Sequence, residues 1–241
     1  MISILKKEIS SYLGSLIGYL VIATFIIATG LFTWIFPDSS VLNGGFSELR
    51  SFFNIAPFVF LFIVPAITMR LFSEEFRSGT IELLFTKPLT INQIVSGKYF
   101  SSVFIIGLML IFSLIFYVSI YQLGSPVGNI DTAAVAGSYF GLLLIGAVFS
   151  AIGLLTSAST NNQIIAFIVA VFINFCFFVG ISSISSLFEG SLSVLLENLS
   201  LNYHYEALGR GLIDSRNLIY MVSIIIFCLV ATGYRLDQLK K

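Results

Sequence analysis

Charged residues are scarce in this sequence. Its 241 residues include only 12 lysines and arginines and 12 aspartates and glutamates, or 10% of the chain, whereas a water-soluble domain carries about 25%. Hydrophobic residues reach 57% and the mean hydropathy is +1.01. This composition excludes a water-soluble domain and predicts an integral membrane protein embedded in the lipid bilayer. Because the net charge is zero, nothing points to a nucleic-acid partner.

Residues that commonly carry out chemistry are also few. The two cysteines, Cys176 and Cys228, lie inside apolar segments, where cysteine behaves as a small hydrophobic residue. His204 is the only histidine. Because no metal-ligand cluster surrounds it, we expect it at the outer interface beside Tyr203 and Tyr205, without a metal. The phosphate-binding pattern G-x-x-x-x-G-K-[ST] is missing. We therefore expect a non-catalytic chain without a cofactor of its own.

Long uncharged runs define the expected fold. A membrane-spanning helix needs roughly 20 apolar residues, and the sequence predicts an all-α integral membrane protein with six transmembrane helices. Their predicted bounds are 13–36, 51–70, 99–121, 136–156, 164–187 and 218–234. The first run is too long for the core of a signal peptide, so it is expected to stay in the mature protein. The spans carry almost no ionisable residue, which argues against a secondary transporter or channel.

Short helices are predicted outside the spans. Residues 1–10 place Ile2, Leu5 and Ile9 near one helical face. This predicts an N-terminal interfacial helix, which is either a lever that contacts a partner or an ordinary basic anchor. Between the fifth and sixth spans, apolar residues at helical spacing predict two short interfacial or re-entrant helices on the outer side. These residues are Leu192, Leu195, Leu196 and Leu199, then Tyr205, Leu208 and Leu212.

Glycine and proline mark packing and bending positions. Glycines spaced four apart allow close helix packing, and we favour packing within the chain over a dimer face. The pairs are Gly14 with Gly18 and Gly137 with Gly141. Pro57 and Pro65 predict kinks in the second span. Turn-forming residues predict loops at 37–50 and 122–135.

Lysine and arginine are distributed unevenly over the two sides of the predicted topology. Six spans put both termini on one side. That side holds Lys6, Lys7, Arg70, Arg77, Lys87, Lys98, Arg235, Lys240 and Lys241, and the other side holds Arg50, Arg210 and Arg216. Because cytoplasmic loops are enriched in these residues, both termini are expected in the cytoplasm.

The interior stretch 73–98, between the second and third spans, is the densest in charge. Its charged residues are Glu74, Glu75, Arg77, Glu82, Lys87 and Lys98. Gly79 predicts a sharp turn, and Pro88 ends the short helix that follows it. Thr90 predicts the start of a new helix, because it forms a capping box with Gln93. Such a defined shape favours a docking surface for a soluble partner over a solvated loop.

The same stretch resembles a known family. The pattern E-E-x-R-x-G-T-x-E-L-L-x-T-x-P-L-T at 74–90 is similar to the segment after the second span in permeases of the type-2 ABC exporter superfamily. The resemblance extends over residues 1–241 as a single permease domain. It implies a cytoplasmic coupling helix resting on a separate ABC ATPase subunit, which binds the ATP, and pairing with a second permease subunit. The implied ATPase-coupling residues are Glu74, Glu75, Arg77, Gly79, Thr80, Glu82, Leu83, Leu84 and Pro88.

Segments before the last span resemble a subfamily, the gliding-motility-associated ABC transporter permease, F subunit, of Bacteroidetes. They are residues 203–206 (YHYE), 210–214 (RGLID) and 217–220 (NLIY). Where these relatives often carry an acidic residue, this chain has Asn217. The resemblance implies a bacterial inner-membrane exporter linked to gliding motility.

A membrane scaffold of a gliding or secretion apparatus, without a cargo of its own, is the alternative function. For an exporter, spans rich in Phe, Ser and Gly fit a path for lipid, polysaccharide or peptide equally well. Both a homodimer and a heterodimer of permease subunits are consistent with the sequence.

Overall fold

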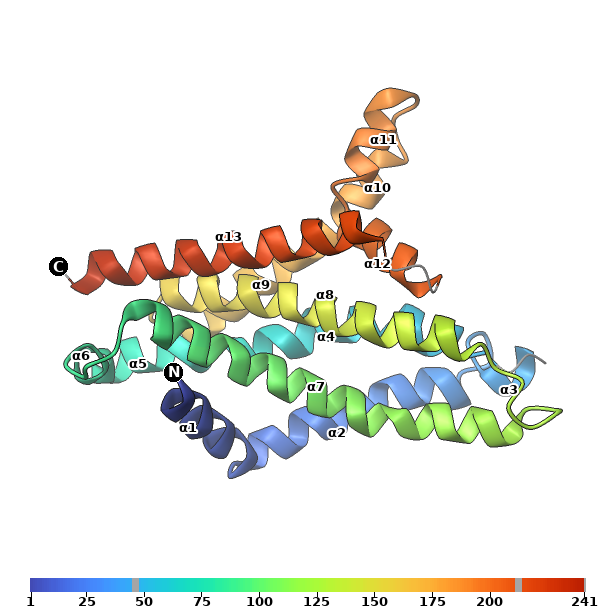
Figure 1. Ribbon diagram of the computed structural model, residues 1–241, viewed down its shortest axis with the longest axis horizontal. Helices are drawn as coiled ribbons and strands as arrows, with labels where there is room; N and C mark the ends of the chain where they lie inside the picture. Colours follow the sequence, from blue (N-terminus) through green and yellow to red (C-terminus); the bar gives the residue numbers. More distant parts are fainter. Residues whose placement is uncertain (45–47, 211–213, 241) are drawn as a thin grey trace.

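The computed structural model describes residues 1–44, 48–210 and 214–240, and the regular secondary structure in these residues is helical (Figure 1). The helices are α1 (Ile2–Leu13), α2 (Leu16–Gly30), the π-helical segment η1 (Leu31–Ile35), α3 (Val41–Gly44), α4 (Arg50–Thr68), α5 (Arg70–Ser78), α6 (Thr80–Phe85), α7 (Ile91–Leu123), α8 (Thr132–Ser159), α9 (Gln163–Phe175), the π-helical segment η2 (Cys176–Gly180), α10 (Ile181–Ser185), α11 (Ser191–Glu197), α12 (Leu201–Gly209) and α13 (Ser215–Lys240). The predicted all-α class is confirmed for the described residues.

Six helical segments of the described chain are long and apolar enough to cross a membrane, which confirms the predicted number and order of spans. They are Leu16–Ile35, Arg50–Ser78, Ile91–Leu123, Thr132–Ser159, Gln163–Ser185 and Ser215–Lys240. The predicted bounds are too short where polar residues prolong a helix. The third span begins at Ile91 because a capping box starts the helix there. The sixth span continues beyond 234 because the tail residues are good helix formers and extend an existing helix readily.

α8 is the central helix of the bundle. Of the 18 consecutive residues that make up its most apolar part, 78% are buried. The corresponding share is 22% in the first and fifth spans and 28% in the sixth. α8 packs against α4, α5, α7, α9, α12 and α13. Small residues allow this close packing, because a side chain at Gly146 would collide with Ile106 and one at Gly153 would collide with Thr68.

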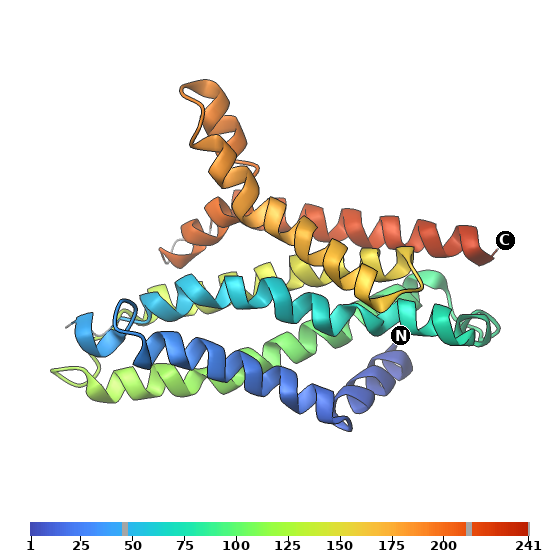
Figure 2. The same ribbon diagram turned by 180° about the vertical axis from the view of Figure 1, so that it is seen from behind.

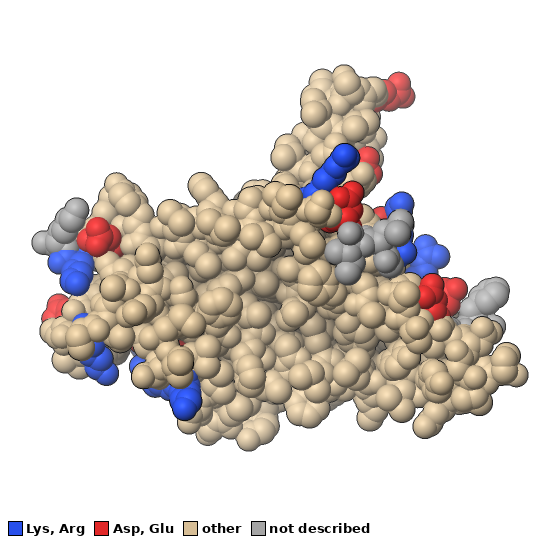
Figure 3. All heavy atoms as spheres, in the orientation of Figure 1, with Lys and Arg blue, Asp and Glu red and all other residues tan. Residues whose placement is uncertain are grey.

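On the face shown in Figure 3, charged side chains gather at the two ends of the bundle and are scarce between them. The N-terminus, the short helix α6 and the C-terminal end of α13 lie at one end, which we call the basic end (Figure 1). Its described basic residues are Lys6, Lys7, Arg70, Arg77, Lys87, Lys98, Arg235 and Lys240, and those of the opposite end are Arg50, Arg210 and Arg216. Lys241, which the sequence assigns to the basic end, lies outside the described residues.

The opposite end carries the short helices. α10 and α11 project sideways from the bundle, and α12 folds back toward it (Figures 1 and 2). Two of these helices, α11 and α12, coincide with the apolar spacing predicted before the last span, although Leu212 lies outside the described residues. The predicted loop at 37–50 contains α3, and its residues 45–47 are also outside them. α4 runs unbroken through Pro57 and Pro65 to Thr68.

Candidate functional site

The charged stretch at the end of the second span is a helical hairpin, in which α5, the last part of that span, turns sharply into α6 (Figure 1). Gly79 joins the two helices with φ 70° and ψ 5°, a left-handed conformation that glycine adopts without steric penalty. A side chain there would meet nothing within 4 Å, so backbone conformation and not space requires glycine. α6 ends ahead of Pro88. Thr90 then begins α7 with both hydrogen bonds of the capping box to Gln93, at 3.2 and 3.3 Å. The predicted turn and capping box are confirmed.

Most of the implied coupling residues lie exposed on this hairpin. We call the exposed ones the hairpin surface: Glu74, Arg77, Gly79, Thr80, Glu82, Leu83 and Pro88. Leu83 is an apolar side chain that is 65% exposed, whereas Leu84 is 8% exposed and belongs to the core. Exposed groups of both charges around one apolar side chain are suited to contact with another protein.

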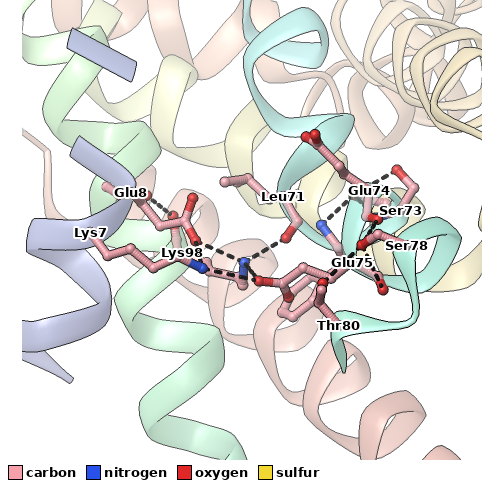
Figure 4. A network of polar contacts seen from close by, with 12 residues as sticks. Lys7, Glu8, Leu71, Ser73, Glu74, Glu75, Ser78, Thr80 and Lys98 are labelled. Atoms are coloured by element: carbon pink, nitrogen blue, oxygen red, sulfur yellow. Dashed lines mark hydrogen bonds and ion pairs between the residues drawn. The ribbon is translucent and has the colours of Figure 1, made fainter. Parts of the chain in front are cut away.

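Lys98 is buried at the base of the hairpin, with 1% of its side chain exposed (Figure 4). Its Nζ donates to Glu8 Oε1 at 3.0 Å, to Glu75 Oε1 at 2.9 Å and to the carbonyl oxygen of Leu71 at 2.6 Å. We call these groups the Lys98 cluster. A buried ammonium group requires such partners, and here they come from α1 and α5. Glu75 therefore points inward, unlike the exposed Glu74.

α1 lies against α7 through one row of side chains. Ile4 and Tyr12 are buried, and Glu8 between them reaches the Lys98 cluster. Gly97 allows α7 to come close, because a side chain there would lie 3.1 Å from Ile4. The apolar row that the sequence predicted for a membrane interface is Ile2, Leu5 and Ile9. Ile2 is 67% exposed, so a different row carries the contact with the bundle.

Tyr12 attaches α1 to the second span. Its hydroxyl donates a hydrogen bond to the carbonyl oxygen of Ile67. The guanidinium group of Arg70 lies 3.7 Å from the centroid of the Tyr12 ring, a cation–π contact. Burial raises the pKa of the Tyr12 phenol above its ordinary value, although the nearby Arg70 opposes this shift. The phenol therefore remains a hydrogen-bond donor at neutral pH.

Ser157 on α8 fixes the junction between α4 and α5. Its hydroxyl donates to the carbonyl oxygen of Met69 at 2.7 Å and accepts from the N–H groups of Phe72 at 3.0 Å and Ser73 at 3.2 Å. These backbone groups lie where one helix ends and the next begins, so they lack some helical partners. The base of the hairpin is thus tied to the central helix as well as to α1 and α7.

The four glycines predicted to pack closely contribute in different ways. Gly14 follows α1 as its C-cap. Gly18 is buried, and a side chain there would collide with the backbone at the end of α1. A side chain at Gly141 would lie 3.2 Å from the ring of Tyr205. Gly137 is buried on α8. The contacts of Gly18 and Gly141 lie within the chain, and the dimer role stays a prediction.

His204 is buried at the opposite end, between α12 and α13. Its Nδ1 lies 2.7 Å from Asn217 Oδ1, and its Nε2 lies 2.9 Å from the carbonyl oxygen of Asn198. The imidazole ring also stacks on the ring of Tyr220 at 4.2 Å and meets Tyr203 edge to face. Asn217 therefore holds the imidazole of His204 in place. Within the described residues, no group of three metal-ligating side chains lies close enough to hold a metal ion.

Two residues that organise the site are not among those predicted. Lys98 has one signal in the sequence, because a lysine next to the apolar start of a span must find partners if it is buried. Its partner Glu8 is 90 positions away, so sequence spacing does not identify the pair. Ser157 has no signal, because serine is common in membrane helices and its hydroxyl usually bonds its own helix.

Six apolar helices and a charged hairpin at one end define a multi-pass membrane protein. Residues 2–235 match the family model described as ABC-2 family transporter protein. Because the match spans nearly the whole chain, the chain belongs to this family, and the predicted type-2 ABC permease superfamily is confirmed. Its members are membrane components that normally work with an ABC ATPase partner. No curated protein matches the chain.

Proposed function

We propose that this chain is the permease subunit of an ATP-driven exporter and that a separate ATPase subunit docks on the hairpin surface. One observation carries the proposal, namely that the hairpin exposes charged side chains and Leu83 at its tip while its base is held by buried polar contacts. A partner that pushes on the tip would therefore move the base. Because the sequence lacks the phosphate-binding pattern G-x-x-x-x-G-K-[ST], we propose that the energy comes from ATP hydrolysed by the partner.

The contacts at the base support a path for this movement. The Lys98 cluster connects α5 with α1 and α7, and Ser157 connects it with α8. Because α8 packs against α5 and against five further helices, a shift of α5 would reach most of the spans. Packed helices move as rigid bodies and not as continuously deformable ones, so the path across the membrane would open by helix displacement.

The proposed complex contains two permease subunits in the inner membrane of a bacterium, with the basic end in the cytoplasm. Eight lysines and arginines of the described residues lie at the basic end and three at the opposite end, in agreement with the enrichment of these residues in cytoplasmic segments. The ATPase subunits would then meet the hairpin surface on the side where ATP is available.

We further propose a link to gliding motility. It rests on the resemblance of residues 203–206, 210–214 and 217–220 to a gliding-associated permease. Two of these segments are in contact, because His204 bonds Asn217 and stacks on Tyr220. In a gliding bacterium that encodes this chain, an ATPase partner unable to hydrolyse ATP should abolish gliding. Continued gliding would favour the scaffold function instead.

Co-purification tests the docking proposal. The tagged chain is expressed with its ABC ATPase, and the amount of ATPase recovered in detergent is measured. Glu74→Lys with Glu82→Lys should reduce recovery to background, because both carboxylates are exposed on the hairpin surface. The matched control, Glu189→Lys with Glu197→Lys, reverses two exposed carboxylates of the opposite end and should leave recovery unchanged. Equal recovery with both double variants would rule out docking at this hairpin.

A further inference from the structure

A cavity of about 750 Å³ opens at the opposite end of the bundle, far from the hairpin surface. This volume is within the range of roughly 300–1,000 Å³ that is typical of ligand-binding pockets. Three helices each turn one face into the cavity. α4 and α12 contribute residues three or four positions apart, such as Arg50, Phe53 and Asn54 on α4 and Tyr205 and Gly209 on α12. The first turns of α8 close the third side.

Aromatic side chains form the apolar part of this cavity. Phe53 and Phe178 are 8% and 2% exposed, whereas Phe58 is 50% exposed although it also lines the cavity. Phe58 lies eight residues after Arg50 on α4, which is about 12 Å along the helix. The wall is fixed in place, because the Tyr205 hydroxyl donates to the carbonyl oxygen of Phe53 at 2.7 Å. The cavity thus extends from a polar rim to an exposed aromatic side chain.

The rim carries two guanidinium groups. Arg50 and Arg210 both line the cavity and are exposed, and neither forms an ion pair within the described residues. Two of the rim carboxylates are already engaged. Asp131 accepts from two backbone N–H groups at the start of α8, at 3.0 and 3.1 Å. Glu206 accepts from Asn202 Nδ2 at 2.8 Å.

The charges of the rim select the class of ligand. Guanidinium groups bind phosphate oxygens with strong, charge-assisted hydrogen bonds. Three carboxylates (Glu48, Asp131 and Glu206) line the same cavity as the two guanidinium groups, so its lining carries a formal charge of −1. A purely anionic ligand would be repelled, whereas a ligand that also carries an ammonium group would be attracted. The aromatic part suits an apolar chain.

We infer that this cavity binds a zwitterionic amphiphile, with its phosphate at Arg50 and Arg210, its ammonium group at the carboxylates and its apolar chain along Phe58. This inference goes beyond the proposed function, because it concerns a ligand of the opposite end and requires no ATPase. Its test uses the purified chain alone, so it fails or succeeds independently of docking at the hairpin surface.

Native mass spectrometry of the delipidated chain in detergent tests this inference. The probes are short-chain phosphatidylethanolamine, phosphatidylglycerol and diacylglycerol at equal concentrations. We expect phosphatidylethanolamine to bind best and diacylglycerol least. Arg50→Gln with Arg210→Gln should weaken the binding of both phospholipids at least about tenfold, because two charge-assisted contacts are lost. Arg216→Gln, a matched charge removal at the same end but outside the cavity lining, should leave binding unchanged.

A second variant separates the ammonium contact from the phosphate contact. Glu206→Gln keeps an acceptor for Asn202 but removes a negative charge from the rim. This variant should weaken the binding of phosphatidylethanolamine and leave the binding of phosphatidylglycerol unchanged. The inference would be overturned if diacylglycerol bound as well as phosphatidylethanolamine. It would also be overturned if Arg216→Gln weakened phospholipid binding as much as the double arginine variant does. If inorganic phosphate binds with the same dependence on the two arginines and the phospholipids do not bind, the site is one for free phosphate. The inference of an amphiphile would then be wrong.

Discussion

Lys98 is the residue on which the hairpin depends most. Its side chain is 1% exposed, and the two glutamates that face it are 12% and 13% exposed. A charge in such surroundings is stable only while its partners are present. Without Lys98, Glu8 and Glu75 would keep only the longer contacts of 3.9 and 3.7 Å to Lys7, whose side chain is 66% exposed. The second carboxylate oxygen of Glu75 already lacks a partner within the described residues. The cluster is therefore sensitive to the loss of any member.

Lys98→Met should lower the free energy of unfolding by about 3 kcal/mol, because Glu8 and Glu75 would lose their buried cation. The control, Lys87→Met, removes an exposed lysine of the same end. It should change the free energy of unfolding by less than about 0.5 kcal/mol. The measurement is unfolding in mixed micelles, followed by circular dichroism. Superimposable curves for the two variants would show that the Lys98 cluster contributes nothing.

Tyr12 gives the chain a pH dependence at high pH. Burial raises the pKa of its phenol above the ordinary value of 10.0. The folded chain therefore holds this proton more tightly than the unfolded chain does. The resulting stabilisation is fully present below pH 10 and is lost as the pH rises through the folded-state pKa.

Tyr12→Phe should consequently lose less stability above pH 10 than the parent chain does. The variant cannot donate to Ile67, so at neutral pH it should be less stable by about 1 kcal/mol. Unfolding curves recorded at several pH values between 8 and 11 measure both effects. Tyr203→Phe, at an exposed position, serves as the control. An unchanged pH dependence in Tyr12→Phe would contradict the assigned role of the phenol.

At the scale of elements, the sequence predicts type and order better than bounds and contacts. Six spans, the turn at Gly79 and the Thr90 capping box follow from composition and local chemistry, and all three occur. The extension of α13 does not follow, because polar ends of membrane helices resemble loops in hydropathy. The row of α1 side chains that packs on the bundle also does not follow from the sequence, because the burial of Ile4 and Tyr12 depends on a partner helix distant in sequence.

The hairpin provides a test of element geometry. Gly79→Ala should cost about 1 kcal/mol, because alanine resists the left-handed conformation. It should also weaken ATPase recovery in the co-purification, since α6 would be displaced from α5. Gly79→Asn is the control, because asparagine tolerates this conformation better than other residues, and it should recover more ATPase. The opposite order of the two variants would show that the turn does not depend on backbone conformation.

At the scale of the whole molecule, the two ends have different chemistry. The basic end presents the hairpin surface, and the opposite end presents a mixed-charge cavity above aromatic side chains. Between them, the face seen in Figure 3 carries few charged side chains. This separation suits a protein that receives force at one end and handles a ligand at the other. Neither the cavity nor the Lys98 cluster could be predicted from the sequence, because each joins residues from at least three separated helices.

Site-specific photo-crosslinking tests the central claim most directly. A photoreactive amino acid replaces Leu83 on the hairpin surface or Leu187 at the opposite end, which are 65% and 80% exposed. The chain is expressed with its ABC ATPase and irradiated in membranes. We expect the ATPase to be crosslinked from position 83 and not from position 187. Crosslinking from 187 alone, or none from 83 while the ATPase still co-purifies, would contradict docking at the hairpin surface.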